Sequence, residues 1–301
     1  NILPEMAKEL GLSEECLIVA GGGDANLGCV GVGVCKGGQA ALFGGSFWQL
    51  EYNINKPTID KDCRVRVNCH VLPDTWQHEM IAFFPGLVMR WFRDAFCQWE
   101  KHIAEQRGVS AYSVLEELAK DVPAGSNGMY CSFSSIMDYK EWKHASPAFV
   151  NFNIDPEKFN KGTFYKALME NAALVTLGHA KIIGALNNAV LDEITFASGA
   201  SNSPLWCQIV SDVLGARVKV PKVKEATALG TAICAGVGAG VYDSIESAAD
   251  KLVQFEQVYE PNMENHKKYL EIFETWKEIN KTQMGNSDKG LISHMWKAPG
   301  L

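Results

Sequence analysis

The sequence lacks the features that mark several large classes of protein. It has no Cys-x-x-Cys pair, and no uninterrupted apolar run approaches the roughly 20 residues that a membrane-spanning helix needs. It also has no excess of basic residues, since 28 Lys and Arg stand against 35 Asp and Glu, for a net charge of -7. Because phosphate binding needs clustered Lys and Arg, we expect neither nucleic acid nor an anionic membrane as a general partner.

The cysteines do not form a convincing metal site. Cys63, Cys69 and His70 come nearest to one, but a six-residue spacing without a second pair of ligands is poor support for zinc. The chain has nine cysteines, an odd number, and most lie in apolar segments, which favours reduced packing residues. No charged leader with an apolar core opens the sequence, so we expect a cytoplasmic protein.

What the sequence does contain is enough apolar material for a large core. Its 301 residues are 47% hydrophobic and 21% charged, which suits one large domain or two ordinary ones. We find no internal repeat and no low-complexity linker. Residues 1–15 predict a polar helix and turn, and the opening Asn1 is not an initiator Met, so we expect a segment of a longer protein.

The hydrophobic pattern alternates between the periods of strands and helices. The predicted strands are residues 17–20, 39–43, 47–54, 64–71, 79–84, 193–198 and 216–221. The predicted helices are a Gly-rich helix after Asp24, then residues 86–106, 112–120 with Ser110 as its cap, 163–186, 204–215 and 225–240, and most of the last forty residues. Hairpins first and alternating strands and helices later predict an α/β domain with a mixed sheet.

Three glycine-containing turns could hold chemistry. Residues 21–23 let the backbone approach a ligand, and Asp24 presents a carboxylate at the end of a predicted strand, where open α/β sheets bind ligands. The turn at 44–46 offers free N–H groups and a hydroxyl to an anion, and the turn at 198–200 precedes a helix N-terminus. Taken singly, each could be only a turn, and Asp24 could simply cap the next helix.

In their order along the chain, these segments resemble the C-terminal half of an FGGY-type carbohydrate kinase. The likeness covers essentially the whole chain and rests on "GGGDANLG", "LFGGSFW", "GLVMRWFRD", "LMENAALVT", "SGASNSPLWCQIVSDVLG" and "EATALGTAICAGVGAG". It implies an actin-like, ribonuclease-H-like ATPase domain over residues 1–301, with 262–301 as its helical extension. The family's Asp-x-Gly-Thr phosphate loop is not in this sequence, so we expect the sugar-binding N-terminal domain to be absent and the fragment to be inactive alone.

The resemblance also assigns roles to single residues. Asp24 matches the catalytic base, a carboxylate that accepts the proton of the substrate hydroxyl while its oxygen attacks the γ-phosphorus of ATP. Ala25 stands where glycerol kinases carry a substrate-contacting Gln, which argues against glycerol. The positions matched to ATP contacts are Gly44, Gly45, Ser46, Gly86, Arg90, Gly199, Ala200, Asn202 and Ser203. Mg²⁺ is implied with ATP and is expected to be held largely by phosphate and water rather than by protein ligands.

Several matched positions have a structural alternative. Gly45 stands where relatives often have Thr, so a hydroxyl contact must come from Ser46. Arg90 replaces a Gln and could meet phosphate or remain a solvated helix charge. Glu225 and Gly230 match "E-x-x-A-L-G", and we expect the Glu to organise a helix start and the Gly to permit close helix contact.

The remaining histidines carry little signal. His179 lies on a predicted helix and could reach a cleft, but a lone helical histidine is usually packed or solvated. Trp142 and His144, in "DYKEWKHASP", match a family segment that adjoins the cleft, and they could lie near the substrate. We assign catalysis to no histidine.

The resemblance implies an ATP-dependent phosphotransferase with an alcohol group as acceptor. The substrate it favours is a small linear sugar-like molecule, 4,5-dihydroxypentane-2,3-dione, phosphorylated on its terminal hydroxyl. The alternatives are a family kinase for xylulose, ribulose, gluconate or glycerol, and a non-catalytic actin-like nucleotide-binding module. The expected partners are the substrate, ATP and the missing N-terminal domain, with a homodimer left open.

Overall fold

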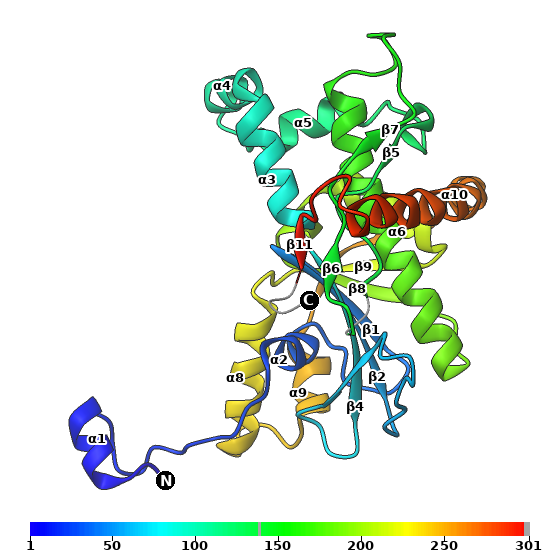
Figure 1. Ribbon diagram of the computed structural model, residues 1–301. Coiled ribbons are helices and arrows are strands. Elements are labelled where there is room, and N and C mark those ends of the chain that lie inside the picture. The colour runs from blue at the N-terminus through cyan, green and yellow to red at the C-terminus, as the bar shows by residue number, and fades with distance from the viewer. Residues whose placement is uncertain (138–139, 298–301) are drawn as a thin grey trace.

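A seven-stranded mixed sheet forms the centre of the protein (Figure 1). The structure is a computed structural model that describes residues 1–137 and 140–297. The strand order is β10-β9-β8-β1-β2-β4-β3, where β1, β8 and β9 are parallel and the other pairs are antiparallel. The strands are β1 (Ala40–Gly44), β2 (Phe47–Ile54), β3 (Arg66–Cys69), β4 (Trp76–Phe83), β8 (Glu193–Ala197), β9 (Arg217–Pro221) and β10 (Phe255–Tyr259). The predicted α/β class with a mixed sheet is confirmed.

The register brings the C-terminal ends of three strands, β1, β4 and β8, to the same end of the sheet. Gly44 at the end of β1 lies opposite Trp48, and Phe43 beside it pairs with Ala197 at the end of β8. Phe83 ends β4 opposite Phe47, the first residue of β2. The segments that follow β1, β4 and β8 therefore leave the sheet side by side.

Helices cover both faces of the sheet (Figure 1). On one face, Trp48 and Leu50 point into the main core with α6 (Lys161–Asn187), α7 (Pro204–Leu214) and α10 (Met263–Asp288). Trp48 Nε1 donates a hydrogen bond of 2.7 Å to Thr176 Oγ1, which ties β2 to α6. On the other face, Ala41 and Phe43 pack against α2 (Asp24–Gly31) and α8 (Ala226–Gly238), and α9 (Ile245–Leu252) packs beside these two helices.

Two glycines allow α2 and α8 to touch. A Cβ atom added to Gly31 would lie 1.8 Å from the carbonyl oxygen of Ala226, and one added to Gly230 would lie 1.8 Å from that of Leu27. The prediction that Gly230 permits close helix contact is confirmed. Glu225 does stand at the start of α8, but its side chain makes no capping hydrogen bond, so it does not organise the helix start in that way.

The helix predicted over residues 86–106 is wrong as a single element. It is two helices, α3 (Pro85–Phe96) and α4 (Gln98–Arg107), which meet at Cys97 with φ -118° and ψ 43°. Cys97 is buried and its Sγ contacts the carbonyl of Phe92, so the break turns an apolar residue into the core without interrupting the apolar pattern. The next helix, α5 (Ala111–Ala119), begins as predicted, because Ser110 Oγ accepts from the Tyr112 amide.

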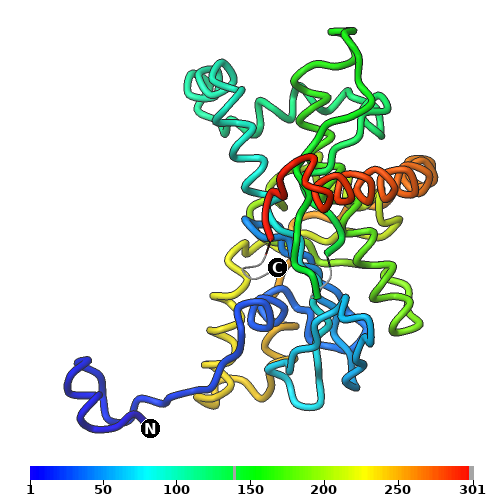
Figure 2. The backbone as a smooth tube through the Cα atoms, in the orientation of Figure 1, coloured from blue at the N-terminus to red at the C-terminus, as the bar shows by residue number. Residues whose placement is uncertain are grey.

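The strand predicted at residues 17–20 is also wrong. The segment has no strand partner among the described residues, and Leu17, Ile18 and Val19 are exposed. Its apolar residues match the pattern of a buried strand, but none of the seven strands of the sheet pairs with it. Ahead of it, α1 (Pro4–Leu10) stands away from the body, as the chain trace in Figure 2 makes plain.

Shorter elements complete the chain. None of the short strands was predicted from the sequence, and neither were α9 and the edge strand β10. The short elements are η1 (Ser126–Gly128), β5 (Tyr130–Cys131), β6 (Lys143–His144), β7 (Phe149–Val150), η2 (Gly199–Asn202) and β11 (Trp296–Lys297). The predicted terminal helix is confirmed as α10, and the last four residues of the predicted extension lie outside the described part.

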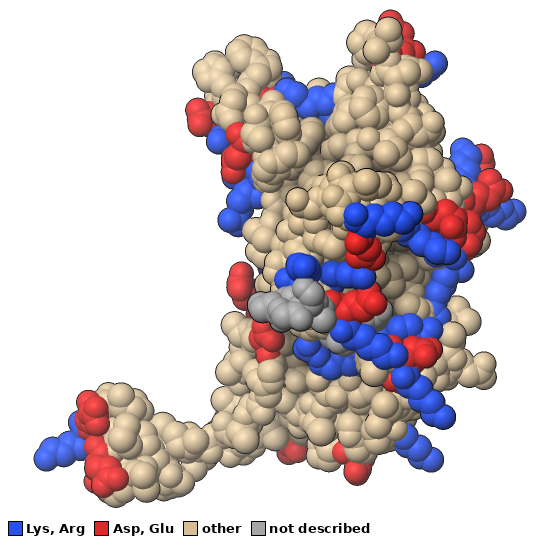
Figure 3. Space-filling model, viewed as in Figure 1, with Lys and Arg blue, Asp and Glu red and all other residues tan. Residues whose placement is uncertain are grey.

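The surface carries both acidic and basic side chains, as the charge composition predicts. On the face in Figure 3, acidic and basic side chains are interspersed over much of the body. All nine cysteines are free and six of them are buried, although Cys63 and Cys69 are exposed. Within residues 1–137 and 140–297, no helix combines the length and apolar character needed to span a membrane.

Candidate functional site

A cavity of about 510 Å³ opens at the sheet edge where β1, β4 and β8 end. It brings together all the positions that were matched to ATP contacts, although they come from three separate parts of the sequence. These residues are Gly44, Gly45, Ser46, Gly86, Arg90, Gly199, Ala200, Asn202 and Ser203. The parallel pairing of β1 with β8 explains why the turn at 44–46 and the loop at 199–203 face the same space.

The turn between β1 and β2 forms one side of the cavity. Gly45 N–H donates to the Phe47 carbonyl at 2.9 Å, so this amide closes the turn. The expectation that the turn leaves its N–H groups free for an anion is therefore wrong for Gly45. Gly44 is required by packing, because an added Cβ would come within 2.7 Å of the Ala200 Cβ. Ser46 is exposed and lines the cavity.

Helix α3 begins directly against this turn. A Cβ on Gly86 would lie 2.1 Å from the Gly45 carbonyl oxygen, so only glycine lets the first turn of the helix approach so closely. Arg90, one helical turn later, is exposed and lines the cavity. Phe84, just before the helix, has φ 79°, and Ser198, just before the loop at 199–203, has φ 73°. Such conformations are costly for non-glycine residues and collect at functional sites.

The loop after β8 forms the opposite side. A Cβ added to Gly199 would meet no atom within 4 Å, so this residue borders open space in the cavity. Ser203 caps α7, because its Oγ accepts from the Trp206 amide at 3.1 Å. Asn202 is exposed beside it.

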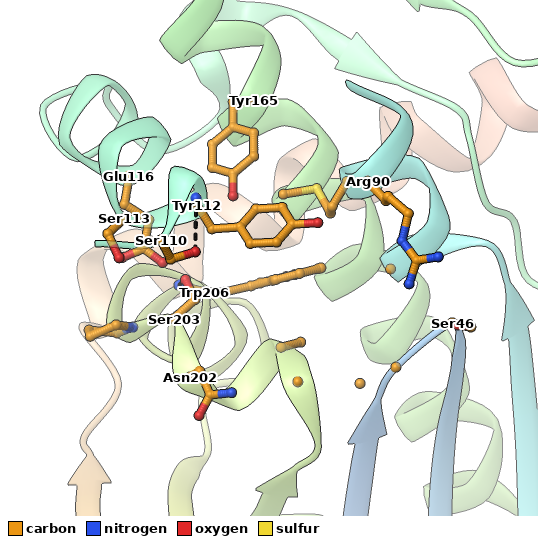
Figure 4. A pocket seen from close by; sticks show the side chains of 17 residues that line it. Ser46, Arg90, Ser110, Tyr112, Ser113, Glu116, Tyr165, Asn202, Ser203 and Trp206 are labelled. Carbon is orange, nitrogen blue, oxygen red and sulfur yellow. Dashed lines mark hydrogen bonds between the residues drawn. The ribbon is translucent and has the colours of Figure 1, made fainter. Parts of the chain in front are cut away.

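Helix α5 supplies cavity residues that the sequence analysis missed (Figure 4). The missed lining residues are Met89, Ser110, Tyr112, Ser113, Glu116, Tyr165, Pro204 and Trp206. The Tyr112 ring lies 5.1 Å from the Arg93 guanidinium, whose Nη1 donates to the Tyr112 hydroxyl at 3.2 Å. Burial raises the pKa of Glu116, and hydrogen bonding with Ser203 and the Leu205 amide opposes the rise. No motif marked the cavity residues of α5; only the capping signal at Ser110 pointed to this helix.

Asp24 does not line this cavity. It is the first residue of α2, after Gly23 as the N-cap, so it is not the cap itself. It is exposed, its Oδ1 accepts from the Ala25 amide at 2.9 Å, and its carbonyl accepts from Thr227 Oγ1 at 3.1 Å. Helix α2 covers the sheet face opposite α6 and α7, from which Tyr165 and Trp206 reach the cavity.

Of the glycines before Asp24, Gly22 is required by close packing. We expected them to turn the chain at a strand end, but no strand precedes them, and none of residues 21–23 is among the positive-φ glycines of the described chain. A Cβ on Gly22 would lie 2.3 Å from Val71 Cγ1, so the segment passes close to the loop after β3.

The sheet face below α2 carries buried polar side chains. Glu51 is fully buried, and among the described residues neither of its carboxylate oxygens has a hydrogen-bond partner. Burial, then the charges of Glu79 and Asp24, raises its pKa well above the usual range. Glu79, directly opposite on β4, forms an ion pair of 2.7 Å with Arg66.

The histidines singled out earlier are packing residues. His179 is fully buried on α6, and His144 lies 5.1 Å and 5.5 Å from the ring centres of Phe83 and Phe84. Neither lines the cavity, and Trp142 packs against Phe83 as well. That Trp142 and His144 lie near the substrate stays a prediction. Residues 138–139 of the same segment lie outside the described part.

Over the described ranges there is no group of three His, Cys, Asp or Glu side chains that could hold a metal ion.

The sequence was compared with families and with curated proteins. Residues 53–239 match the FGGY family of carbohydrate kinases, C-terminal domain. The autoinducer-2 kinase of Enterobacter sp. (strain 638) is 48% identical over 98% of this chain and 56% of its own length. The autoinducer-2 kinase of Salmonella typhimurium (strain LT2) is 46% identical over 100% of this chain and 57% of its own length. The chain thus spans little more than half the length of these curated relatives.

Solved structures share the fold at low sequence identity. Xylulose kinase from Rhodospirillum rubrum superposes with a TM-score of 0.78 at 20% identity, covering 94% of this chain and 55% of its own. Gluconate kinase from Lactobacillus acidophilus gives 0.77 at 18% identity, covering 94% of this chain and 56% of its own. The predicted actin-like, ribonuclease-H-like ATPase fold is confirmed. With the family match covering more than half of its residues, the chain belongs to the FGGY family of carbohydrate kinases and carries the family's C-terminal domain.

Proposed function

We propose that this chain is the nucleotide-binding part of an ATP-dependent kinase that phosphorylates the terminal hydroxyl of 4,5-dihydroxypentane-2,3-dione, the autoinducer-2 precursor. The observation that carries the proposal is the single cavity that collects the matched positions of three distant segments. The identity of nearly half to proteins named autoinducer-2 kinase supports the substrate. Phosphorylation would make this quorum-sensing signal anionic and retain it in the cytoplasm.

The cavity suits a nucleotide in size and in the order of its groups. Its volume of about 510 Å³ lies within the range of roughly 300 to 1,000 Å³ that small-molecule sites occupy. Ser46 and Arg90 can meet phosphate at one end, and the loop at 199–203 offers space without a side chain at Gly199 for a planar base. Because the Gly45 amide already donates to the Phe47 carbonyl, the Ser46 hydroxyl and Arg90 are the main phosphate contacts on this side.

Asp24 is the residue we propose as the base. It is exposed at the start of α2, so a substrate hydroxyl can approach its carboxylate. In a loose phosphoryl-transfer transition state the proton leaves late, and the position of the carboxylate matters more than a high pKa. The Ala25 amide bonded to Asp24 Oδ1 fixes one oxygen and so orients the other.

Two elements of the reaction lie outside this chain. Mg²⁺ accompanies ATP in kinases, but the described residues hold no group of three candidate ligands, so we derive no step through a protein-bound metal. The chain spans 56% of its Enterobacter relative, and we propose that the remaining part of a longer protein supplies the sugar contacts. On this view the 301-residue chain has no kinase activity by itself.

The test is Asp24→Asn in the full-length protein, with exposed Asp243→Asn as the matched control. We expect Asp24→Asn to lose several orders of magnitude in turnover of the dione while its affinity for ATP stays unchanged, and the control to keep full activity. Undiminished turnover would remove Asp24 as the base. Xylulose, ribulose, gluconate and glycerol are assayed in parallel, and a preference for any of them would overturn the substrate assignment but leave the kinase reaction in place.

A further inference from the structure

The cavity carries one charge of each sign. Among the described residues that line it, Arg90 is the only cation and Glu116 the only carboxylate. Figure 4 shows them at opposite sides, with Ser46 near Arg90, and with Ser110, Ser113 and Ser203 near Glu116. The aromatic side chains of the cavity lie between the two groups. A ligand that spans the cavity therefore meets a positive group at one end and a hydrogen-bond acceptor at the other.

Glu116 lies beside the start of α7. The Ser203 hydroxyl and the Leu205 amide are its polar neighbours there, and Ser203 is itself fixed as the cap of that helix. The side chain is half-buried against this helix end while its residue still lines the cavity. An ionised carboxylate can only accept hydrogen bonds, so it selects for donors on the ligand.

We propose that Glu116 accepts a hydrogen bond from the exocyclic amino group of adenine and thereby selects 6-aminopurine nucleotides over 6-oxopurine nucleotides. This inference rests on the proposed function, which places the phosphates at the Ser46 and Arg90 end. A carboxylate repels phosphate, so the triphosphate extends away from Glu116 and the base reaches toward it. A 6-oxo group would place two acceptors face to face, and neither could donate a hydrogen bond to the other.

ATP and inosine triphosphate provide the test, because the two differ at the 6-amino and 6-oxo position. Their dissociation constants are measured with the full-length protein by calorimetry, together with that of 2′-deoxy-ATP. The variants are Glu116→Gln and, as matched control, Glu117→Gln. The Glu117 carboxylate is exposed and pairs with Arg107. Thermal unfolding checks that both variants are folded.

We expect the wild type to bind ATP about 10-fold or more tightly than inosine triphosphate, since the rejected analogue leaves a charged acceptor unpaired. Glu116→Gln should bring the two affinities to within about threefold of each other, because its amide can donate as well as accept. Glu117→Gln should keep the wild-type ratio.

Each other outcome overturns a defined part of the argument. Equal wild-type affinities, or an unchanged ratio in Glu116→Gln, overturn the role of Glu116 and leave the nucleotide site in place. A variant that changes the ratio of ATP to 2′-deoxy-ATP instead would assign Glu116 to the ribose and also refute the inference. If none of the three nucleotides binds the wild type, the proposed function fails, and this inference fails with it.

Discussion

Replacing Glu51 with glutamine should shift the stability difference from the wild type in favour of the variant as the pH rises. Glu51 lies on β2 directly opposite Glu79 on β4 and is fully buried. Over the described ranges, neither of its carboxylate oxygens has a hydrogen-bond partner. Burial, followed by the charges of Glu79 and Asp24, raises its pKa well above its usual range, so the folded chain keeps this carboxyl protonated when the unfolded chain has already lost the proton.

The size of the effect follows from proton binding. Between the ordinary pKa of 4.5 and the raised folded value, the folded state binds one proton more than the unfolded state at this site. The contribution of Glu51 to the free energy of unfolding is therefore fully present below pH 4.5 and falls by about 1.4 kcal/mol for each pH unit above it. The loss stops at the folded pKa. Glutamine does not titrate, so the stability difference between variant and wild type should rise with this slope.

Urea unfolding at pH 5, 6, 7 and 8, followed by circular dichroism, measures this difference. Glu271→Gln is the control, because Glu271 is an exposed carboxylate on α10. We expect the control to follow the wild type and Glu51→Gln to diverge from both, and the pH at which the divergence levels off gives the folded pKa of Glu51. Parallel pH profiles for wild type and Glu51→Gln would show that Glu51 ionises normally and would refute the reasoning.

Three further substitutions test packing and a buried hydrogen bond. Gly230→Ala should lower the free energy of unfolding by about 2 kcal/mol or more, because its Cβ would lie 1.8 Å from the Leu27 carbonyl oxygen. Gly285→Ala on α10, where an added Cβ meets nothing within 4 Å, should instead stabilise by up to about 1 kcal/mol, and equal effects in urea unfolding would contradict the packing argument. Tyr269→Phe removes the 2.7 Å hydrogen bond to the buried Glu170 and should cost about 1 to 3 kcal/mol, which an unchanged urea midpoint would disprove.

The cavity was predictable because it consists of turns at strand ends. Once β1 and β8 are parallel neighbours, the turn at 44–46 and the loop at 199–203 must share an edge, and both are marked by glycine. Glu116 carries no such mark. Its place in the cavity depends on how α5 packs on α6, which is a tertiary contact that the pattern of one sequence does not contain.

The errors at residues 17–20 and at Cys97 have a common cause. An apolar run predicts burial, but it does not say which partner supplies that burial, and residues 17–20 find no neighbouring strand in the described chain. At Cys97 the apolar period runs on through a change of direction, so the break is set by the surface on which the two helices pack. The local apolar pattern therefore located these segments, but it did not give their secondary structure or the break between two helices.

The two faces of the sheet differ in polarity. The face toward α6 is apolar at Trp48 and Leu50, whereas the face toward α2 buries Glu51 close enough to Asp24 for their charges to interact. A protonated Glu51 is neutral, so it does not add a second negative charge beside the proposed base. Glutamine at this position keeps that neutrality, and Glu51→Gln should therefore change stability without changing turnover. Asp24→Asn should do the reverse, because Asp24 is exposed and is the proposed base.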